Sequence, residues 1–421
     1  MPSTLTWLDH DAAAQEASLR ILQLFQERDT RDELGIGAVR DGLADLMFPG
    51  TSTIQTRLRY MLFVPWIYQA LEEKRVPPHE MAARGRRLEA DLIEQLLISE
   101  DHAGTIGSDA RANLKRLPSS VYWNGLAVWG IRCFVGSQSD YHRWIGEIYA
   151  RRHTSSALDD DPTSPDPATV TWCTSLPPRP ERFPIGSSFA LAPSEASFLR
   201  DRIAVSNPES LLAHLVRHAA SAEVPFIWEH PDYADFRPDH RSLVDEARRL
   251  SETMHGAALM YNLMLAERRA AGESGGERSE LASTYRARYA DWARSTDVRE
   301  LRRWKTEVLW ASLAAHPTAR VSFTTRRFIE YWIDVAAHRA EAAVDDAAVR
   351  LALQHRERAL KGPQARLFSQ AALDRWGGQS GLRRLDYRWS ITQTFLRDLS
   401  AGLARAASDS AEAAAGDDAR P

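Results

Sequence analysis

The chain has 421 residues, of which 44% are hydrophobic and 26% are charged, and its formal net charge at pH 7 is −4. This composition is typical of a globular protein and excludes a wholly disordered chain, while the length favours two domains. The two cysteines, Cys133 and Cys173, are too few for a disulfide framework or a cysteine zinc site.

Nothing in the sequence indicates a membrane segment or a secretory signal. The longest apolar run, residues 61–67, is far shorter than the roughly 20 residues that span a bilayer. The N-terminal sequence MPSTLTWLDHDAAAQ lacks a basic region followed by an apolar one. We therefore expect a cytoplasmic protein that does not contact a membrane.

Apolar residues recur at helical spacing along most of the chain, which predicts a mostly α fold with minor β at most. Only residues 171–172, 226–228 and 321–323 are short and β-prone enough to be strands. In chain order, helices are expected from a capping Asp9 through residue 25, then at about 36–46, 53–72, 79–98, 118–129, 141–151, 242–269, 280–294, 298–315, 324–338, 345–359 and 389–405.

The helix at 53–72 is predicted to be the most deeply buried. Thr51 or Ser52 is its expected cap. Its centre, residues 60–68, is apolar on every side, as in a helix at the centre of a domain. Pro65 lies within this run and is expected to kink the helix.

Residues 154–193 differ from the rest, because eight of the chain's 21 prolines lie between positions 162 and 193. Proline geometry nearly excludes regular helix there. We expect an irregular linker, in contact with the surface through Trp172, Phe183 and Phe189. It would join two helical domains, residues 1–153 and 194–405. Residues 406–421 contain no large apolar side chain and are expected to be a disordered tail.

The segment 356–397 contains nine basic residues against three acidic ones. Cations that neutralise phosphates, next to rings that stack on bases, are typical of nucleic-acid contact, and nearby glycines allow amides to approach an anion. The alternative is a solvated loop whose arginines pair with acidic residues elsewhere while its tryptophans are core residues. The residues expected to bind nucleic acid are Lys361, Arg366, Arg383, Arg384 and Arg388 for phosphate, and Trp376 and Tyr387 for stacking.

A second candidate anion site precedes the helix predicted at 53–72. There the hydroxyls of Thr51 and Ser52 and the cations of Arg57 and Arg59 would surround the free amides and positive end of the helix. The Gly-Lys-Ser/Thr spacing of a P-loop is missing, and an ordinary helix cap explains the same residues.

Two patterns point to catalysis instead. His214 and His218 have the spacing at which two imidazoles on one helix share a metal, although no glutamate follows His214. Arg350 and His355 fit the Arg-x4-His pattern of HEPN-class helical ribonucleases, which would stabilise phosphate charge and move a proton, but Leu351 replaces the usual polar residue. Spacings of both kinds are also expected by chance in a chain with 13 His and 49 Arg, and we expect neither a metal nor another cofactor.

Five short runs are distinctive: 30–37 (TRDELGIG), 48–57 (FPGTSTIQTR), 63–68 (FVPWIY), 116–123 (RLPSSVYW) and 385–389 (LDYRW). Through them the chain resembles an uncharacterised bacterial family, a domain of unknown function, over nearly its whole length apart from 154–193. The family has no assigned catalytic residues. Its relatives often lie beside helicase and phospholipase-D-like genes in anti-phage defence neighbourhoods. The resemblance thus implies a nucleic-acid-related role beside a helicase or nuclease subunit.

We therefore predict a non-enzymatic nucleic-acid-binding or scaffolding subunit of a bacterial anti-phage defence complex. A helical ribonuclease or metal-dependent hydrolase, and a protein-interaction module without nucleic acid, remain open as alternatives. Charge reversal at Arg383, Arg384 and Arg388 is expected to leave the fold intact and to abolish salt-sensitive binding.

Overall fold

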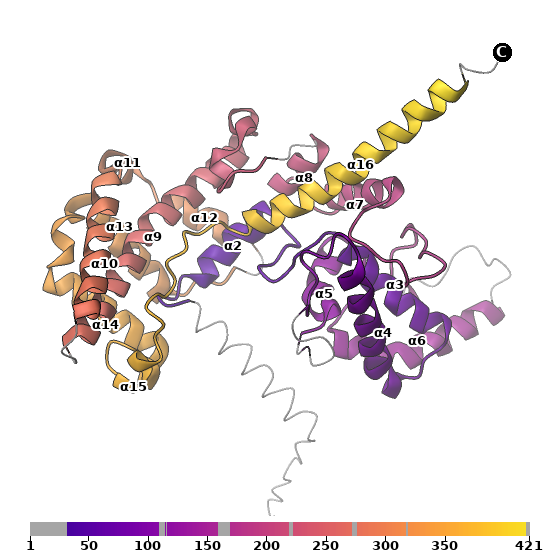
Figure 1. The fold of residues 1–421 in the computed structure, drawn as a ribbon, viewed down its shortest axis with the longest axis horizontal. Coiled ribbons are helices and arrows are strands. Elements are labelled where there is room, and N and C mark those ends of the chain that lie inside the picture. Colours follow the sequence, from indigo (N-terminus) through magenta and orange to yellow (C-terminus); the bar gives the residue numbers. More distant parts are fainter. Residues whose placement is uncertain are drawn as a thin grey trace, which may run out of the picture. The chain divides into compact units, whose positions relative to one another are not determined.

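The computed structural model describes residues 32–108, 114, 116–158, 169–218, 222–271, 276–316 and 319–417, without the side chains of 155–158, 276–279 and 406–417. Within these ranges the elements are helices (Figure 1), and β structure is limited to one isolated antiparallel bridge between Arg132 and Trp172. The predicted mostly α class with minor β is therefore confirmed. The helix predicted behind Asp9 lies outside the described residues. Among those residues, no helix has the length and apolar character needed to cross a bilayer.

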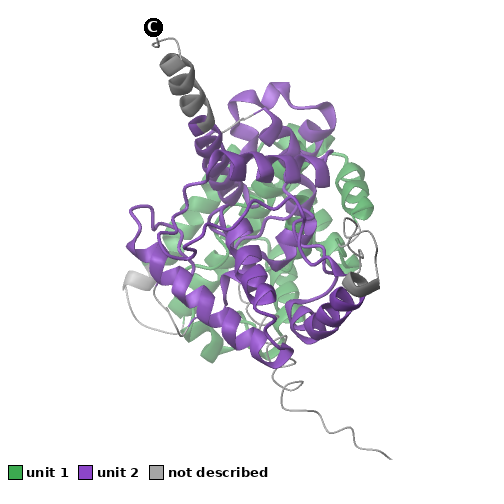
Figure 2. Cartoon of the chain, turned by 90° about the vertical axis from the view of Figure 1, so that its right-hand side faces the viewer, with its two compact units in different colours: residues 1–43, 245–387 green, residues 44–244, 388–421 purple. Residues whose placement is uncertain are grey.

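The chain forms two compact units, which Figure 2 shows in different colours. Unit 1 contains residues 1–43 and 245–387, and unit 2 contains residues 44–244 and 388–421. Each unit therefore combines segments that are far apart in the sequence. The part of the predicted linker that the structure describes, residues 169–193, belongs to unit 2.

Unit 2 is built around a group of packed helices. Helix α3 packs against α4 and α5, α4 packs against α6, and α7 packs against α8 and α16. Helices α4 and α5 each begin with a proline, at a position where the missing N–H costs no hydrogen bond. The helices are α3 (Tyr60–Glu73), α4 (Pro78–Ile98), α5 (Pro118–Val128), α6 (Gln138–Leu158), α7 (Pro193–Ser206), α8 (Leu211–Arg217) and α16 (Trp389–Asp417), with two short 3-10 helices, η3 (Ile227–Glu229) and η4 (Pro231–Asp235).

Helix α3 provides the centre of this packing. Residues 60–68 are all buried, and Pro65 lies inside the helix. The irregular segment 169–192 packs against it: the indole of Trp66 donates to the carbonyl of Pro177 at 2.8 Å, and Phe183 stacks on Phe63 with ring centroids 5.9 Å apart. The prediction of a helix buried on every side is therefore confirmed.

The predicted start of this helix at Thr53 was wrong, since α3 begins at Tyr60. The backbone N–H groups of Thr56 and Arg57 both donate to the hydroxyl of Tyr122, at 2.9 and 3.1 Å. Amides engaged in this way cannot make the i to i−4 bonds of a helix. The tyrosine comes from α5, so periodicity in the local sequence carried no information about it.

Unit 1 contains most of two helices that cross its boundaries, α2 (Gly37–Met47) and α9 (Pro238–Ala271). Aspartates cap two others: Asp297 accepts two backbone N–H groups at the start of α11, and Asp346 does the same for α14. The remaining helices are α10 (Gly276–Ser295), α11 (Val298–Arg303), α12 (Glu307–Ala315), α13 (Phe323–Arg339), α14 (Ala347–Lys361) and α15 (Gln370–Asp374), with the 3-10 helices η5 (Ala342–Val344) and η6 (Gly362–Gln364).

Two sequence predictions need correction here. The single helix predicted at 298–315 is two helices, because Trp304 has an extended backbone (φ −66°, ψ 117°) and its indole donates to Glu246 at 2.7 Å. Of the three predicted strands, 226–228 runs into a 3-10 helix and 321–323 contains Ser322, whose hydroxyl caps α13. The third is the single β-bridge of Trp172.

Candidate anion-binding pocket

Two of the residues predicted to bind phosphate form ion pairs within unit 1. Lys361 and Arg366 both form ion pairs with the carboxylate of Glu33, the arginine at 2.7 Å. The side chain of Glu33 is only 6% exposed, and those of Lys361 and Arg366 are 10% and 20% exposed. These two cations therefore neutralise a buried acid of their own unit.

The two predicted stacking residues are core residues. Trp376 is 2% exposed, and the guanidinium of Arg269 lies 4.8 Å from its ring centroid. Tyr387 is 1% exposed, and its hydroxyl donates to the carbonyl of Ala247 at 2.7 Å. Neither ring offers a free face to a base. For Trp376 this agrees with the alternative interpretation of the basic segment, in which its tryptophans are core residues.

The last three cations have different surroundings. Arg383 is 79% exposed and pairs with Asp386 at 3.2 Å. Arg388 belongs to unit 2, where it is 10% exposed and pairs with Asp45 at 2.5 Å. Arg384 belongs to unit 1 and lines a pocket.

The second candidate anion site is also internally paired. Arg57 forms ion pairs with two aspartates, the nearer at 2.6 Å, and Arg59 pairs with Glu195 at 2.7 Å. The hydroxyl of Thr51 donates to a backbone carbonyl at 2.6 Å, and the backbone N–H of Ser52 donates to a glutamine side chain at 2.9 Å. Helix α3 begins well beyond these two residues, so its first amides do not lie between them.

His214 on α8 and His218, the C-cap of that helix, lie close together. The rings of His214 and His218 have centroids 4.2 Å apart, and the Nδ1 atom of His218 bonds the carbonyl of His214 at 2.7 Å. In the part of the chain that the structure describes, no group of three His, Cys, Asp or Glu residues is placed to hold a metal ion.

The Arg-x4-His pair lies on α14. Arg350 forms an ion pair with Glu267 and donates to a backbone carbonyl at 2.8 Å. His355 is exposed, and five residues along a helix correspond to about 140° around its axis. The two side chains therefore leave α14 on different faces.

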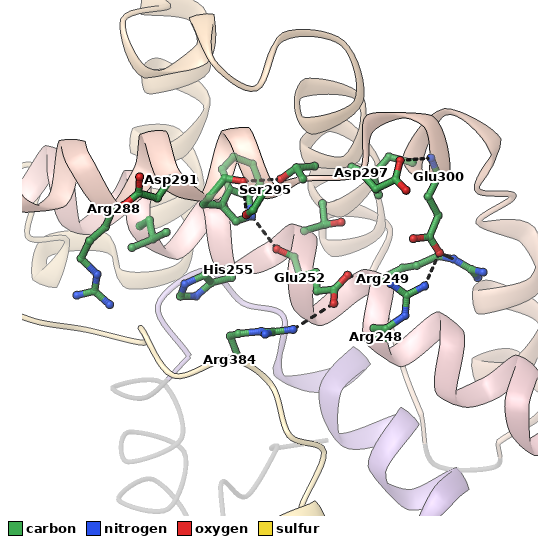
Figure 3. A pocket seen from close by; sticks show the side chains of 15 residues that line it. Arg248, Arg249, Glu252, His255, Arg288, Asp291, Ser295, Asp297, Glu300 and Arg384 are labelled. Carbon is green, nitrogen blue, oxygen red and sulfur yellow. Dashed lines mark hydrogen bonds and ion pairs between the residues drawn. The ribbon is translucent and has the colours of Figure 1, made fainter. Parts of the chain in front are cut away.

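Arg384 lines a pocket in unit 1 with a volume of about 740 Å³. The other lining residues come from α9, from the C-terminal part of α10 and from the start of α11 (Figure 3). Gly256 allows the close approach of α9 and α10, because a Cβ at this position would lie 2.2 Å from the ring of Trp292. The indole of Trp292 also donates to the backbone carbonyl of Glu252 at 2.9 Å, which fixes this wall.

One side of the pocket is electrostatically balanced. Arg248 and Arg249 both pair with Glu300, the second at 2.8 Å. Arg248 also pairs with Glu252 at 3.1 Å. Asp297, which lines the same side, accepts the first amides of α11 as its cap.

The other side holds Arg384 and Arg288 together with Asp291, and the lining as a whole has four arginines and four carboxylates. Arg384 pairs with Glu252 at 3.2 Å, so it shares this carboxylate with Arg248. Arg288 is exposed on α10, and among the described residues no carboxylate lies within ion-pair distance of it. Figure 3 shows His255 between these two arginines. Burial and the charges of Arg384 and Arg288 lower the pKa of His255 to about 4, so its imidazole is neutral at pH 7.

Buried polar atoms without a hydrogen-bond partner among the described residues occur in the pocket wall. They include the hydroxyl of Thr253, whose residue is 1% exposed, and Nδ1 of His255. Buried polar atoms are rarely left without a partner, and such exceptions call for an explanation. An anionic ligand with several oxygen atoms would supply partners for both.

The sequence profile of the family of unknown function DUF6361 matches residues 2–402. The chain belongs to this family. The whole-chain resemblance to a domain of unknown function is therefore confirmed. No curated protein and no solved structure matches the chain.

Sequence reasoning found one residue of the pocket of this DUF6361 chain, Arg384, and missed Thr253, His255 and Arg288. Nothing in the local sequence distinguishes these three, since they lie on long helices among many other polar residues. The signal that was present is Gly256 in the middle of α9, because a glycine inside a helix often marks close packing. It indicates where another helix approaches, although not which one.

Proposed function

We propose that this chain is a non-enzymatic subunit that binds nucleic acid through the pocket of unit 1. The observation that carries the proposal is the pair of arginines, Arg288 and Arg384, beside the neutral imidazole of His255. A guanidinium can make two parallel hydrogen bonds to one phosphate, and phosphate contacts supply most of the non-specific affinity for nucleic acid.

In the ion pairs described for the pocket, neither arginine is the sole partner of an acid. Arg288 has no carboxylate partner within the described part of the chain, and its guanidinium lies 5.7 Å from the ring centroid of Tyr285. Glu252 contacts Arg248 as well as Arg384, so the release of Arg384 leaves the carboxylate with one cation. The charge of a bound phosphate would therefore meet two guanidinium groups at little cost in broken ion pairs.

The hydroxyl groups in the pocket support a binding role. Ser295 and Thr296 both donate to the backbone carbonyl of Trp292, at 2.9 and 2.8 Å. A serine or threonine nucleophile needs a hydrogen bond to a base, and the protons of these two hydroxyls are directed to a backbone carbonyl instead. The lining residues therefore favour holding a phosphate over cleaving it.

The test is fluorescence-anisotropy binding of internally labelled single-stranded and duplex DNA and RNA across a salt series. The wild-type chain is expected to bind with an affinity that falls steeply with salt. Arg288→Ala and Arg384→Ala should each weaken binding and reduce the salt slope by roughly 0.7–0.9 for each phosphate that the variant no longer neutralises.

Arg375→Ala is the matched control, because this exposed arginine belongs to the same basic segment and bonds Gln364 outside the pocket. It should bind as the wild type does. Equal binding by all three variants and the wild type would overturn the proposal. Its setting, a bacterial defence complex with a helicase or nuclease subunit, stays a prediction that co-purification from a native host would test.

A further inference from the structure

We infer that the pocket takes a phosphomonoester, at the end of a strand or on a free nucleotide, and not a phosphodiester within a strand. The inference deepens the proposed function, since both depend on Arg288 and Arg384. Three features of the pocket carry it: its hydrogen-bonding atoms without partners, its charge and its size.

The first feature is the set of buried polar atoms in the pocket wall that lack hydrogen-bond partners. Thr253 Oγ1 and His255 Nδ1 are both buried, and neither has a partner among the described residues. Thr253 lies deep in the wall, at 1% exposure, while Arg288 is at the surface. A ligand that satisfies this set must carry several oxygen atoms on one small group. A phosphomonoester has three terminal oxygens, whereas a phosphodiester has two, with the chain continuing on both sides.

The second feature is the charge. Arg288 and Arg384 place two cations beside one small volume, and His255 can donate an N–H without adding a third. A phosphomonoester carries a charge of about −1.5 to −2 at pH 7 and a diester carries one negative charge, so the same two guanidinium groups attract the monoester more strongly. Of the other charges, Arg248 and Arg249 pair with Glu300, Asp291 pairs with Arg294, and Asp297 accepts the first amides of α11.

The third feature is the size of the pocket. Its volume of about 740 Å³ lies within the range of roughly 300–1,000 Å³ found for small-molecule sites. Residues of α9, of α10 with α11, and Arg384 line it. A strand end or a nucleotide presents its phosphate with a chain on one side only, whereas a phosphate within a strand has a chain on both sides.

The experiment compares three versions of one internally labelled single-stranded DNA, with a 5′-phosphate, with a 3′-phosphate, or with hydroxyls at both ends. Nucleoside monophosphate, the corresponding nucleoside and inorganic phosphate are tested separately by calorimetry on the full chain. A phosphorylated end is expected to bind at least roughly tenfold more tightly than a hydroxyl end, because each charged hydrogen bond gained is strong. Arg288→Ala should abolish this difference.

Thr253→Val is the most specific variant, since valine has nearly the shape of threonine and lacks only the hydroxyl. Removal of a buried hydroxyl that has no partner should leave resistance to urea unchanged or increased. The same change should reduce the preference for a phosphorylated end several-fold. Arg375→Ala again serves as the control and should preserve the preference.

The outcomes separate the two proposals. Preference for a phosphorylated end supports a strand terminus. If the nucleoside monophosphate binds in an Arg288-dependent way while no DNA binds, the ligand is a free nucleotide and the nucleic-acid proposal fails. Equal binding of all three DNA forms, lost in Arg288→Ala, overturns the phosphomonoester inference and leaves the nucleic-acid proposal standing. Absence of binding by every ligand overturns both.

Discussion

The Nη1 atom of Arg366 lies 2.7 Å from Oε1 of Glu33, and Lys361 pairs with the other oxygen of the same carboxylate. Glu33 thus neutralises two cations that the sequence suggested for phosphate binding. All three side chains are at most 20% exposed, so the charges are weakly hydrated and depend on one another. The basic segment therefore serves in part to hold unit 1 together.

Replacement of Glu33 by glutamine should lower the free energy of unfolding by roughly 3 kcal/mol, because it removes the nearest counterion of two poorly hydrated cations, of which Lys361 keeps a more distant contact with Glu357 at 3.8 Å. Urea unfolding measures the change. Glu330→Gln is the control, since it breaks the exposed pair with Arg326 on α13 and should cost less than about 0.5 kcal/mol. Similar effects from the two substitutions would show that the Glu33 cluster contributes no more than a surface pair.

Gly256→Ala is expected to destabilise unit 1 by roughly 1–3 kcal/mol, through overpacking. A Cβ would lie 2.2–2.4 Å from three ring atoms of Trp292. The ring cannot easily move, because its indole bonds the carbonyl of Glu252 and it stacks on Trp332 with centroids 6.2 Å apart. Urea unfolding would give the size of the loss.

The matched control is Gly85→Ala on α4, where the added Cβ would make only ordinary contacts, the nearest 3.6 Å from the hydroxyl of Tyr68. Alanine has a higher helix propensity than glycine, so this variant should gain up to about 1 kcal/mol. The two substitutions are chemically the same and should have opposite signs. A gain at both positions would contradict the close packing of α9 and α10.

Most helices of the chain follow from local sequence, whereas contacts between distant segments do not. Helical spacing identified most helices, because the positions of apolar residues within a segment determine which face of the helix is buried. Helices α4 and α13 match their predicted ranges closely. The start of α3 was missed because the acceptor for Thr56 and Arg57 is Tyr122, on another helix. No local pattern encodes that bond.

The same limit applies to the candidate site. An arginine that pairs internally and an arginine that faces a ligand have the same sequence pattern, and only the position of the acids distinguishes them. Glu33 lies more than 300 residues before the cations that it neutralises. The pocket depends on α9 approaching α10 and α11, so Arg288 and His255 become neighbours of Arg384 only in the folded chain.

Charge reversal of the basic segment should have unequal effects. Arg383→Glu changes a 79% exposed side chain and should alter stability by less than about 0.5 kcal/mol. Arg388→Glu places a carboxylate beside Asp45 at a site that is 10% exposed, and should cost more than about 2 kcal/mol. Thermal melts of the single variants provide the measurement. We therefore expect the triple reversal to lose stability as well as binding, contrary to the expectation from sequence. Equal melting temperatures for Arg383→Glu and Arg388→Glu would contradict the assignment of Arg388 to a buried ion pair.

In unit 2, Glu89 accepts two hydrogen bonds from one residue, at 2.8 Å from the backbone N–H of Ser119 and at 2.7 Å from its hydroxyl. The side chain of Glu89 is fully buried. Burial raises the pKa of Glu89 to about 7, and the two bonds from Ser119 oppose this shift. The folded chain therefore binds a proton at this site that the unfolded chain releases near its ordinary pKa of 4.5.

The sign of the pH dependence follows from linkage. Because the folded pKa is raised, the site contributes most stability below pH 4.5 and loses that contribution as the pH rises to about 7. Glu89→Gln has no such proton, so its stability relative to the wild type should increase over this window, by up to about 3 kcal/mol. Urea midpoints of both proteins at several pH values measure the difference. Glu94→Gln, which removes an exposed carboxylate from the same helix, is the control, and its urea midpoint should change with pH as that of the wild type does. A constant offset between Glu89→Gln and the wild type would mean that Glu89 is ionised in the folded chain throughout, with Ser119 compensating fully for burial.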